Sequence, residues 1–218
     1  MLNGSAHHSV FEGPNGTWWA AYHILYRNRD RFERRVALDA VGFDEQGRMI
    51  FNGPTETPQW APGVVKDPWR GNDSGSLPLS IGKFALKASS SAPGRGPDYA
   101  VDNHVRTWWQ AAAGDRQPWL EIDLMQEFTV DSARILWSDE GLDVGRGIVP
   151  GPYQYRIEVS VDGKVWTTAV DRTGNRRDDN IQFDEIRPVR ARYVRLTVTG
   201  APPKLPVGVL EFTVFGKP

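Results

Sequence analysis

The chain has 218 residues, a net charge of −1 and an isoelectric point near 6.4, so its charge predicts neither a nucleic-acid-binding surface nor a polybasic membrane patch. The absence of cysteine excludes disulfides, and no apolar run is long enough to span a bilayer. Its 22 glycines, 16 prolines and nine tryptophans are typical of a β-rich protein with many turns.

Residues 1–51 predict a short series of antiparallel strands. A Gly-Pro-Asn-Gly turn at 13–16 precedes the apolar run 17–26, and a second turn at 44–47 follows the strand predicted at 34–43. The run 17–26 is apolar on both faces, which is unfavourable for a sheet with one side in water. Four such strands match one blade of a β-propeller, and a single blade needs neighbours to cover its faces.

The segments AHHSVFEGPNGTWWAAYH and RRVALDAVGFDEQGRMIFNGPTETPQ resemble the last blade of glycoside hydrolase family 43. That family uses a five-bladed propeller to cleave arabinose- or xylose-containing glycans. The resemblance places His7 at the propeller axis, near the active site or its metal, although Ala6 stands where a glycine is usual. The alternative is that His7 is an ordinary histidine at the end of a strand.

The resemblance also implies that the two catalytic carboxylates of such an enzyme lie on earlier blades, which this sequence does not contain. The acidic residues that are present match no catalytic motif and are interpreted as solvated charges: Glu12, Asp30, Glu33, Asp39, Asp44 and Glu45. We therefore expect that this chain alone does not hydrolyse a glycoside. The incomplete propeller domain would span residues 1–58.

Residues 59–78 are rich in Pro, Gly, Ser and Asp, which predicts a linker that Trp60 and Trp69 could pin to a neighbouring surface. From residue 79 to 218, alternating apolar and polar residues predict about eight strands of a jelly-roll β-sandwich, so the whole chain is expected to be all-β. The nine segments from which these strands are expected to form lie at 83–89, 106–110, 119–124, 128–137, 153–161, 165–170, 180–184, 192–198 and 209–215.

The spacing Asp-x-x-x-x-Thr-x-Trp at 102–109 and the Pro-Trp-Leu-x-x-Asp-Leu strand at 118–124 resemble the discoidin, or factor V/VIII type C (F5/8 type C), family. The phrases IEVSVDGKVW, RPVRARYVRLTVTG and LEFTVFG fit the same family, which includes carbohydrate-binding module family 32. The resemblance covers residues 79–218. It implies a non-catalytic glycan-binding module on the tail of a family 43-like glycosidase, acting in polysaccharide degradation outside the cell or in the periplasm.

Two alternatives stay open. The chain could be a split subunit that completes a propeller with another chain, or two copies could pack blade to blade. It could also be a discoidin-type adhesion or surface-binding module, although its charged loops lack the hydrophobic tips which that function would need. The first residues show neither the basic start nor the apolar core of an export signal.

Asp102, Asn103 and Thr107 place oxygen ligands in one loop, which suits a hard cation such as calcium, whereas an Asx turn that caps a strand is the alternative. The resemblance implies five ligand residues for a structural calcium ion: the carbonyls of Tyr99 and His104 and the side chains of Asp102, Thr107 and Glu211. Glu211 lies in an apolar strand, where an unpaired carboxylate would be costly. Asn103 replaces the usual glycine and tolerates the left-handed conformation.

Sugar binding is expected in the loops at one end of the sandwich. Trp109 and Trp119 are predicted to pack, whereas Trp108, on the opposite face of its strand, is the candidate for contact with a sugar. Three polar loops, at 111–117, 138–152 and 172–180, add three further candidates: Arg116, Asp139 and Arg176. The alternative is that these loops are merely solvated and that Trp108 is partly buried. The family resemblance names no particular glycan.

Overall fold

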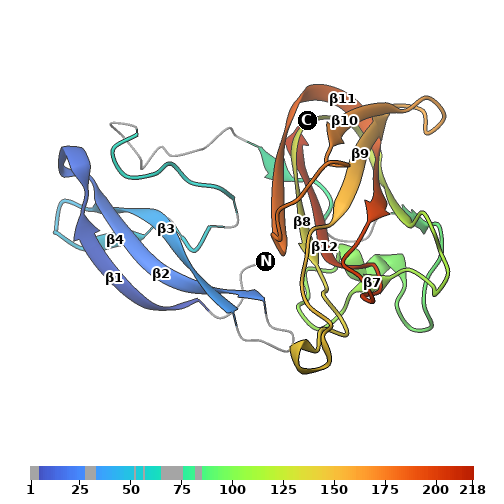
Figure 1. Ribbon diagram of the computed structural model, residues 1–218. Helices are drawn as coiled ribbons and strands as arrows, with labels where there is room; N and C mark the ends of the chain where they lie inside the picture. Colours follow the sequence, from blue (N-terminus) through green and yellow to red (C-terminus); the bar gives the residue numbers. More distant parts are fainter. Residues whose placement is uncertain (1–4, 28–32, 52, 56, 65–75, 82–84) are drawn as a thin grey trace. The chain divides into compact units, whose positions relative to one another are not determined.

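The computed structural model describes the chain except for residues 1–4, 28–32, 52, 56, 65–75 and 82–84 (Figure 1). The chain separates into an N-terminal unit, residues 1–74, and a C-terminal unit, residues 75–218. The division falls inside the predicted linker. Strands dominate the described residues, which confirms the all-β prediction, and no described helix is long and apolar enough to cross a membrane.

The N-terminal unit is a four-stranded antiparallel sheet in the order β1-β2-β3-β4. Its strands are β1 (Ala6–Glu12), β2 (Trp18–Arg27), β3 (Glu33–Phe43) and β4 (Met49–Phe51). Both predicted turns are present, since Gly13 donates to the Thr17 carbonyl and Asp44 donates to the Arg48 carbonyl. A short 3-10 turn, η1 (Pro14–Gly16), lies in the first of them. The predicted series of four strands is therefore confirmed.

Asp39 is not the solvated charge that the sequence predicts. Its side chain is 0% exposed, and its carboxylate accepts hydrogen bonds from the Tyr22 hydroxyl and from the amide and hydroxyl of Thr55. Burial and the neighbouring carboxylate together raise the pKa of Tyr22, which keeps its hydroxyl a donor. These bonds fasten the segment that follows β4 to the sheet. Of the predicted linker residues, Trp60 is exposed, while Trp69 lies outside the described residues, as does Asp30.

The C-terminal unit contains one continuous hydrogen-bonded sheet in the order β10-β9-β11-β8-β12-β5, with β6 also paired to β8 and β7 to β12. The strands are β5 (Leu77–Pro78), β6 (Ala85–Ala88), β7 (Trp109–Gln110), β8 (Trp119–Trp137), β9 (Gln154–Ser160), β10 (Thr167–Asp171), β11 (Ile181–Gly200) and β12 (Gly208–Lys217). Two short 3-10 turns, η2 (Pro97–Ala100) and η3 (Val144–Arg146), lie in the connecting loops.

Two long strands build the two layers of the sandwich. The sequence predicts separate strands at 119–124 and 128–137, but β8 runs through both segments, with an irregular step at Met125, whose φ is +68°. β11 likewise joins the segments predicted at 180–184 and 192–198, and its pairing with β8 shifts register twice. The ring of Trp137 at the end of β8 stacks on Tyr153, 4.0 Å between centroids. The two halves of the sheet therefore face each other across one core.

The core follows the alternation seen in the sequence. Tyr155, Ile157 and Val159 of β9 are buried, while Arg156 between them is exposed. Trp109 is fully buried and donates its indole N–H to the Ser90 carbonyl at 3.0 Å, which confirms its predicted packing role. Burial of these large side chains is the main source of stability in the unit.

Candidate loop-end site

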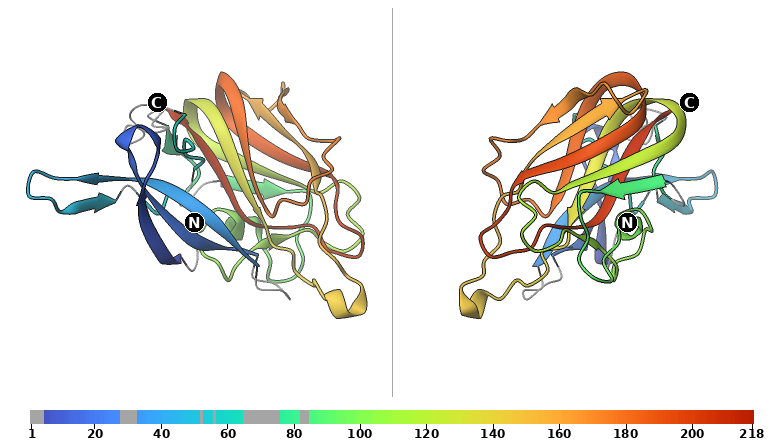
Figure 2. Two further views of the ribbon diagram at one scale, coloured as in Figure 1. Left: turned by 60° about the vertical axis from the view of Figure 1, so that its left-hand side comes forward. Right: turned by 90° about the vertical axis from the view of Figure 1, so that its right-hand side faces the viewer.

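The loops predicted to bind a ligand gather at one end of the C-terminal unit, which we call the loop end. Ala111 donates its amide to the Val207 carbonyl, so the loop after β7 lies beside the loop before β12. The side chain of Asn175 donates to the Tyr153 carbonyl, which fixes the loop 172–180 beside the start of β9. The yellow loop after β8 and the green loop before β7 lie here, away from the C terminus (Figure 1, Figure 2).

The loop before β7 folds around Asp102. One Asp102 oxygen accepts the Thr107 hydroxyl at 2.7 Å, and the other accepts the His104 amide at 3.0 Å. The Thr107 hydroxyl also lies 3.1 Å from the His104 carbonyl oxygen. Asn103 has a φ of +55°, the left-handed conformation that its place in this loop predicts. Three of the five predicted ligand residues are therefore close together.

Glu211 reaches the same loop from β12. Its side chain is 1% exposed, and one oxygen accepts the Asn103 amide at 3.0 Å. The other oxygen is buried and has no hydrogen-bond partner among the described residues. Burial raises the pKa of Glu211 to about 7, and the Asp102 charge acts in the same direction, opposed by the Asn103 amide and by Arg134. A buried carboxylate oxygen without a partner destabilises the fold unless a proton or a cation neutralises it.

A cation fits this arrangement by the chemistry of its donors. Two carboxylates, a hydroxyl and a carbonyl oxygen within one loop and one strand are the oxygen ligands that calcium prefers. Tyr99, whose carbonyl was predicted to bind as well, lies in η2, which packs against β12. No group of three His, Asp or Glu side chains that could hold a metal occurs in the described part of the chain. The predicted set contains only two carboxylates and depends on hydroxyl and carbonyl oxygens for the rest.

Trp108, the candidate for contact with a sugar, is largely buried, which is the alternative that the sequence leaves open. Its side chain is 6% exposed, and its indole donates to the Gln110 side chain at 3.1 Å. The Arg95 guanidinium lies over the ring, with its carbon 3.2 Å from the ring centroid. A guanidinium stacks well on an indole face and shields it from water, so the ring is covered although it points away from the core.

Asp139 is also buried, with 1% of its side chain exposed. Its carboxylate accepts the Tyr153 hydroxyl at 2.9 Å and the Asn180 side-chain amide at 2.8 Å. These bonds join the end of β8 to the starts of β9 and β11. The expectation that Asp139 contacts a sugar is therefore corrected to a structural role, because its oxygens are already engaged by buried donors.

Arg116 and Arg176, two of the candidates for contact with a glycan, are exposed on two loops of the loop end. Neither guanidinium has a hydrogen bond or an ion pair with the residues that the structure describes. Both are therefore available to a ligand. Trp119 is half-buried, and the Arg195 guanidinium lies 5.0 Å from its ring centroid.

Two residues with structural roles at the loop end were not among the site residues predicted from the sequence. One is Arg95, whose only sequence signal is its place in a Gly- and Pro-rich loop shortly before paired tryptophans. The other is buried Asp184, which accepts the Tyr155 hydroxyl at 2.5 Å and Arg172 at 2.7 Å. Burial and Asp184 raise the pKa of Tyr155, so the phenol stays protonated and holds β9 to β11.

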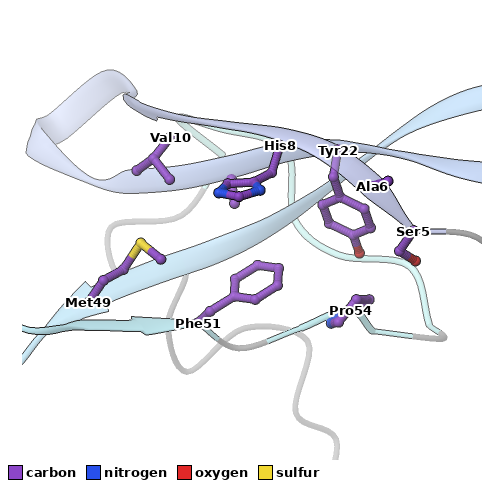
Figure 3. A pocket seen from close by; sticks show the side chains of 9 residues that line it. Ser5, Ala6, His8, Val10, Tyr22, Met49, Phe51 and Pro54 are labelled. Atoms are coloured by element: carbon purple, nitrogen blue, oxygen red, sulfur yellow. The ribbon is translucent and has the colours of Figure 1, made fainter.

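The N-terminal unit has a separate pocket on one face of its sheet, about 200 Å³ in volume (Figure 3). His8 points into it between Val10 and Tyr22, and Met49 and Phe51 form the opposite wall. His7, the residue predicted to mark the propeller axis, is exposed in an irregular part of β1 with a φ of +49°. Its ring stacks on His23 at 5.4 Å between centroids. The described residues supply no catalytic pair of carboxylates around this pocket.

The F5/8 type C domain family matches residues 85–210. Among solved structures, chitosan-binding module 1 from a chitosanase/glucanase of Paenibacillus sp. IK-5 is 25% identical, with a TM-score of 0.54 over 64% of this chain and 99% of that module. Chitosan-binding module 2 from the same source, solved in complex with chitotriose, is 26% identical, with a TM-score of 0.54 over 63% of this chain and 99% of that module.

A family 89 glycoside hydrolase from Clostridium perfringens is 23% identical over 65% of this chain and 15% of its own, with a TM-score of 0.53, which is a likeness of fold alone. The predicted association with family 43 gains no support from these similarities. No match was found among curated protein sequences.

Proposed function

Since the chain belongs to the F5/8 type C domain family, we propose that its C-terminal unit is a non-catalytic carbohydrate-binding module that uses the loop end. The observation that carries this proposal is the similarity to chitosan-binding modules over 99% of their length, one of them solved with chitotriose. The gathering of polar loops at one end of a rigid sandwich supports it, because binding groups on loops need a fixed scaffold. The module would act in polysaccharide degradation, outside the cell or in the periplasm.

Arg116 and Arg176 are the two predicted glycan-contacting residues that the structure leaves open to solvent. Each guanidinium can donate several hydrogen bonds to sugar hydroxyl or carbonyl oxygens. The loss of one such bond weakens binding by about 1 kcal/mol, which is about fivefold in affinity. We therefore assign the first ligand contacts to these two residues.

Isothermal titration calorimetry with chitotriose, and with oligomers of galactose, xylose and arabinose, tests the proposal. Binding by the wild type, weakened about fivefold in Arg116→Ala or Arg176→Ala, is the expected result. The matched control is Arg187→Ala, an exposed arginine near the bend of β11, which should bind like the wild type. Absence of heat with every glycan would contradict the proposal.

We propose further that a structural calcium ion binds between the Asp102 loop and β12. The side chains of Asp102, Thr107 and Glu211 and the carbonyls of Tyr99 and His104 would hold it. A bound cation supplies positive charge next to the two carboxylates, one of whose buried oxygens has no hydrogen-bond partner among the described residues. The expected result is a higher melting temperature with calcium that chelation reverses, and an unchanged melting temperature would contradict the site.

A second function is favoured by the exposed apolar residues of the N-terminal sheet. Val36, Phe43 and Met49 leave large parts of their side chains open. We propose that other β-sheets cover them, either as blades of a family 43-like propeller that this unit completes or as a second copy of the chain. Analytical ultracentrifugation that detects only monomers at high concentration would exclude the second copy.

A further inference from the structure

The three loops that carry the candidate glycan contacts, at 111–117, 138–152 and 172–180, contain charges of both signs, but their carboxylates are already engaged. Asp115 accepts hydrogen bonds from the Ser89 and Ser90 hydroxyls at 2.6 and 2.5 Å. The other five acidic residues of these loops have partners as well: Asp139, Glu140, Asp143, Asp178 and Asp179. The three loops therefore offer a cationic sugar no carboxylate that lacks a partner.

The arginines of the same loops fall into two groups. Three form ion pairs with carboxylates of this chain: Arg146, Arg172 and Arg177. Arg116 and Arg176 are exposed, and neither has an ion pair or a hydrogen bond with the residues that the structure describes. The charge that these three loops leave without a partner is therefore positive.

The loops of Arg116 and Arg176 are joined through neighbouring strands. The carbonyl of Pro118, two residues after Arg116, accepts an amide of β11 at 2.8 Å. β9 pairs with the same part of β11, and the Gln154 side chain of β9 donates to the Asn175 carbonyl, immediately before Arg176, at 2.9 Å. The strand ends that carry the two loops are thus two strand spacings, about 10 Å, apart. A short oligosaccharide can bridge that distance.

From this charge pattern we propose that the loop end selects acidic glycans, whose uronic acid carboxylates or sulfate esters bind the guanidiniums of Arg116 and Arg176. This inference rests on the proposed carbohydrate-binding function and narrows its ligand class. A guanidinium donates paired hydrogen bonds to the oxygens of an anionic group and keeps its charge at every physiological pH. A cationic amino sugar, by contrast, is repelled by both side chains.

The preference has a predictable size. A hydrogen bond from an arginine to an anionic group is stronger than one to a neutral hydroxyl, by an amount equal to about three- to tenfold in affinity. Trigalacturonate should therefore bind about tenfold more tightly than the neutral galactose trimer at low ionic strength. Salt screens exposed charges, so this preference should shrink as sodium chloride is added, whereas binding of the neutral trimer should change little.

Isothermal titration calorimetry of the full chain tests the proposal with four probes: trigalacturonate, a sulfated galactose trimer, the neutral galactose trimer and fully deacetylated chitotriose, which is cationic. Arg116→Gln and Arg176→Gln remove the charge but keep a hydrogen-bond donor. Each should reduce the preference for the acidic trimer over the neutral one by about three- to tenfold. Arg187→Gln, at an exposed arginine near the bend of β11, is the matched control and should keep the preference.

The four probes separate failure of the inference from failure of the proposed function. Tighter binding of the sulfated trimer, but not of trigalacturonate, would support recognition of an anion and assign it to sulfate. Equal affinity for the acidic and neutral trimers, or tighter binding of chitotriose, would overturn the inference and leave carbohydrate binding intact. If the wild type binds none of these probes and no xylose or arabinose oligomer, the proposed function itself fails and the inference fails with it.

Discussion

Both units of this chain are built from strands rich in apolar residues, but the apolar side chains are buried to different degrees in the two units. In the C-terminal unit, β8 and β11 run through both layers, so the apolar face of the sheet closes on itself and Trp109 and Trp137 are fully buried. The described residues of the N-terminal unit form one layer of four strands, and Val36 remains 75% exposed. The N-terminal sheet buries Trp19 and Tyr22 but leaves Val36 open. A sheet face is covered along its whole length only where a second layer exists, and that layer is a property of topology rather than of any one strand.

The largest expected effect is in the closed core. Trp109→Ala removes a fully buried side chain and its hydrogen bond to Ser90, and should lower the free energy of unfolding by about 3–5 kcal/mol. The matched change Trp18→Ala, at a half-exposed position of the N-terminal sheet, should lower it by about 1 kcal/mol. Urea denaturation with hydrogen exchange resolved for each unit measures both. Equal losses would break the comparison, because they would mean that another surface covers the N-terminal sheet in solution.

The next largest loss of stability is expected for substitution of Asp39, since it is the one fully buried carboxylate among the described residues of the N-terminal unit. Asp39→Ala leaves the donors of Tyr22 and Thr55 without an acceptor and should cost about 3 kcal/mol. Asp44→Ala, in an exposed turn, should cost less than about 1 kcal/mol. Thermal melts of the two variants measure the difference, and similar losses would show that Asp39 is solvated after all.

Glu211 predicts how the stability of the C-terminal unit depends on pH in the absence of metal. Its pKa is raised from 4.5 to about 7 in the folded protein, so the stabilisation by its proton is complete below about pH 4.5 and is lost as the pH rises to about 7. Stability should fall by about 2–3 kcal/mol across that window in metal-free protein. Urea denaturation at several pH values measures the slope.

Glu211→Gln is the control for that slope, because the amide does not titrate, and the variant should lack this pH dependence. Calcium at a hundred times its dissociation constant should restore about 2.7 kcal/mol to the wild type near neutral pH but not to the variant. A metal-free wild type whose stability is flat between pH 4.5 and 7 would contradict the raised pKa of Glu211, and equal stabilisation of both proteins by calcium would contradict the proposed cation site.

The smallest effect on stability is expected on the exposed surface of the N-terminal sheet. Val36→Lys should change the free energy of unfolding of a monomer by less than about 0.5 kcal/mol, because the side chain is already mostly in solvent. Thr167→Lys on the exposed strand β10 is the matched control. Sedimentation velocity distinguishes the outcomes: an assembly that Val36→Lys dissociates and Thr167→Lys does not would identify this face as an interface.

The sequence predicts the strands better than it predicts how they join. Alternation locates Leu120, Ile122 and Leu124 on the buried face, but nothing local shows that Met125 continues the strand instead of ending it. The reason is that β8 is held together by pairing with β11, some 70 residues away, and register over that distance leaves no local pattern.

The candidate site also depends on tertiary contacts that the sequence predicts only in part. The family resemblance groups Asp102, Thr107 and Glu211, because a family pattern records residues that meet in space. Asp139 and Trp108 were expected in the open because their loop and strand positions allow it. Their burial depends on Arg95 and on the Tyr153 hydroxyl, which reach them through tertiary contacts that composition does not encode.

The direction of β12 has a practical consequence. This strand starts beside the loops at Gly208 and finishes opposite the bend of β8, where Lys217 pairs with Thr129. A tether attached after Pro218 therefore leaves the sandwich on the side remote from Arg116 and Arg176. Immobilising the protein through its carboxyl end on a sensor chip or bead should present the loops proposed to bind a glycan outward, whereas random coupling through lysines would not.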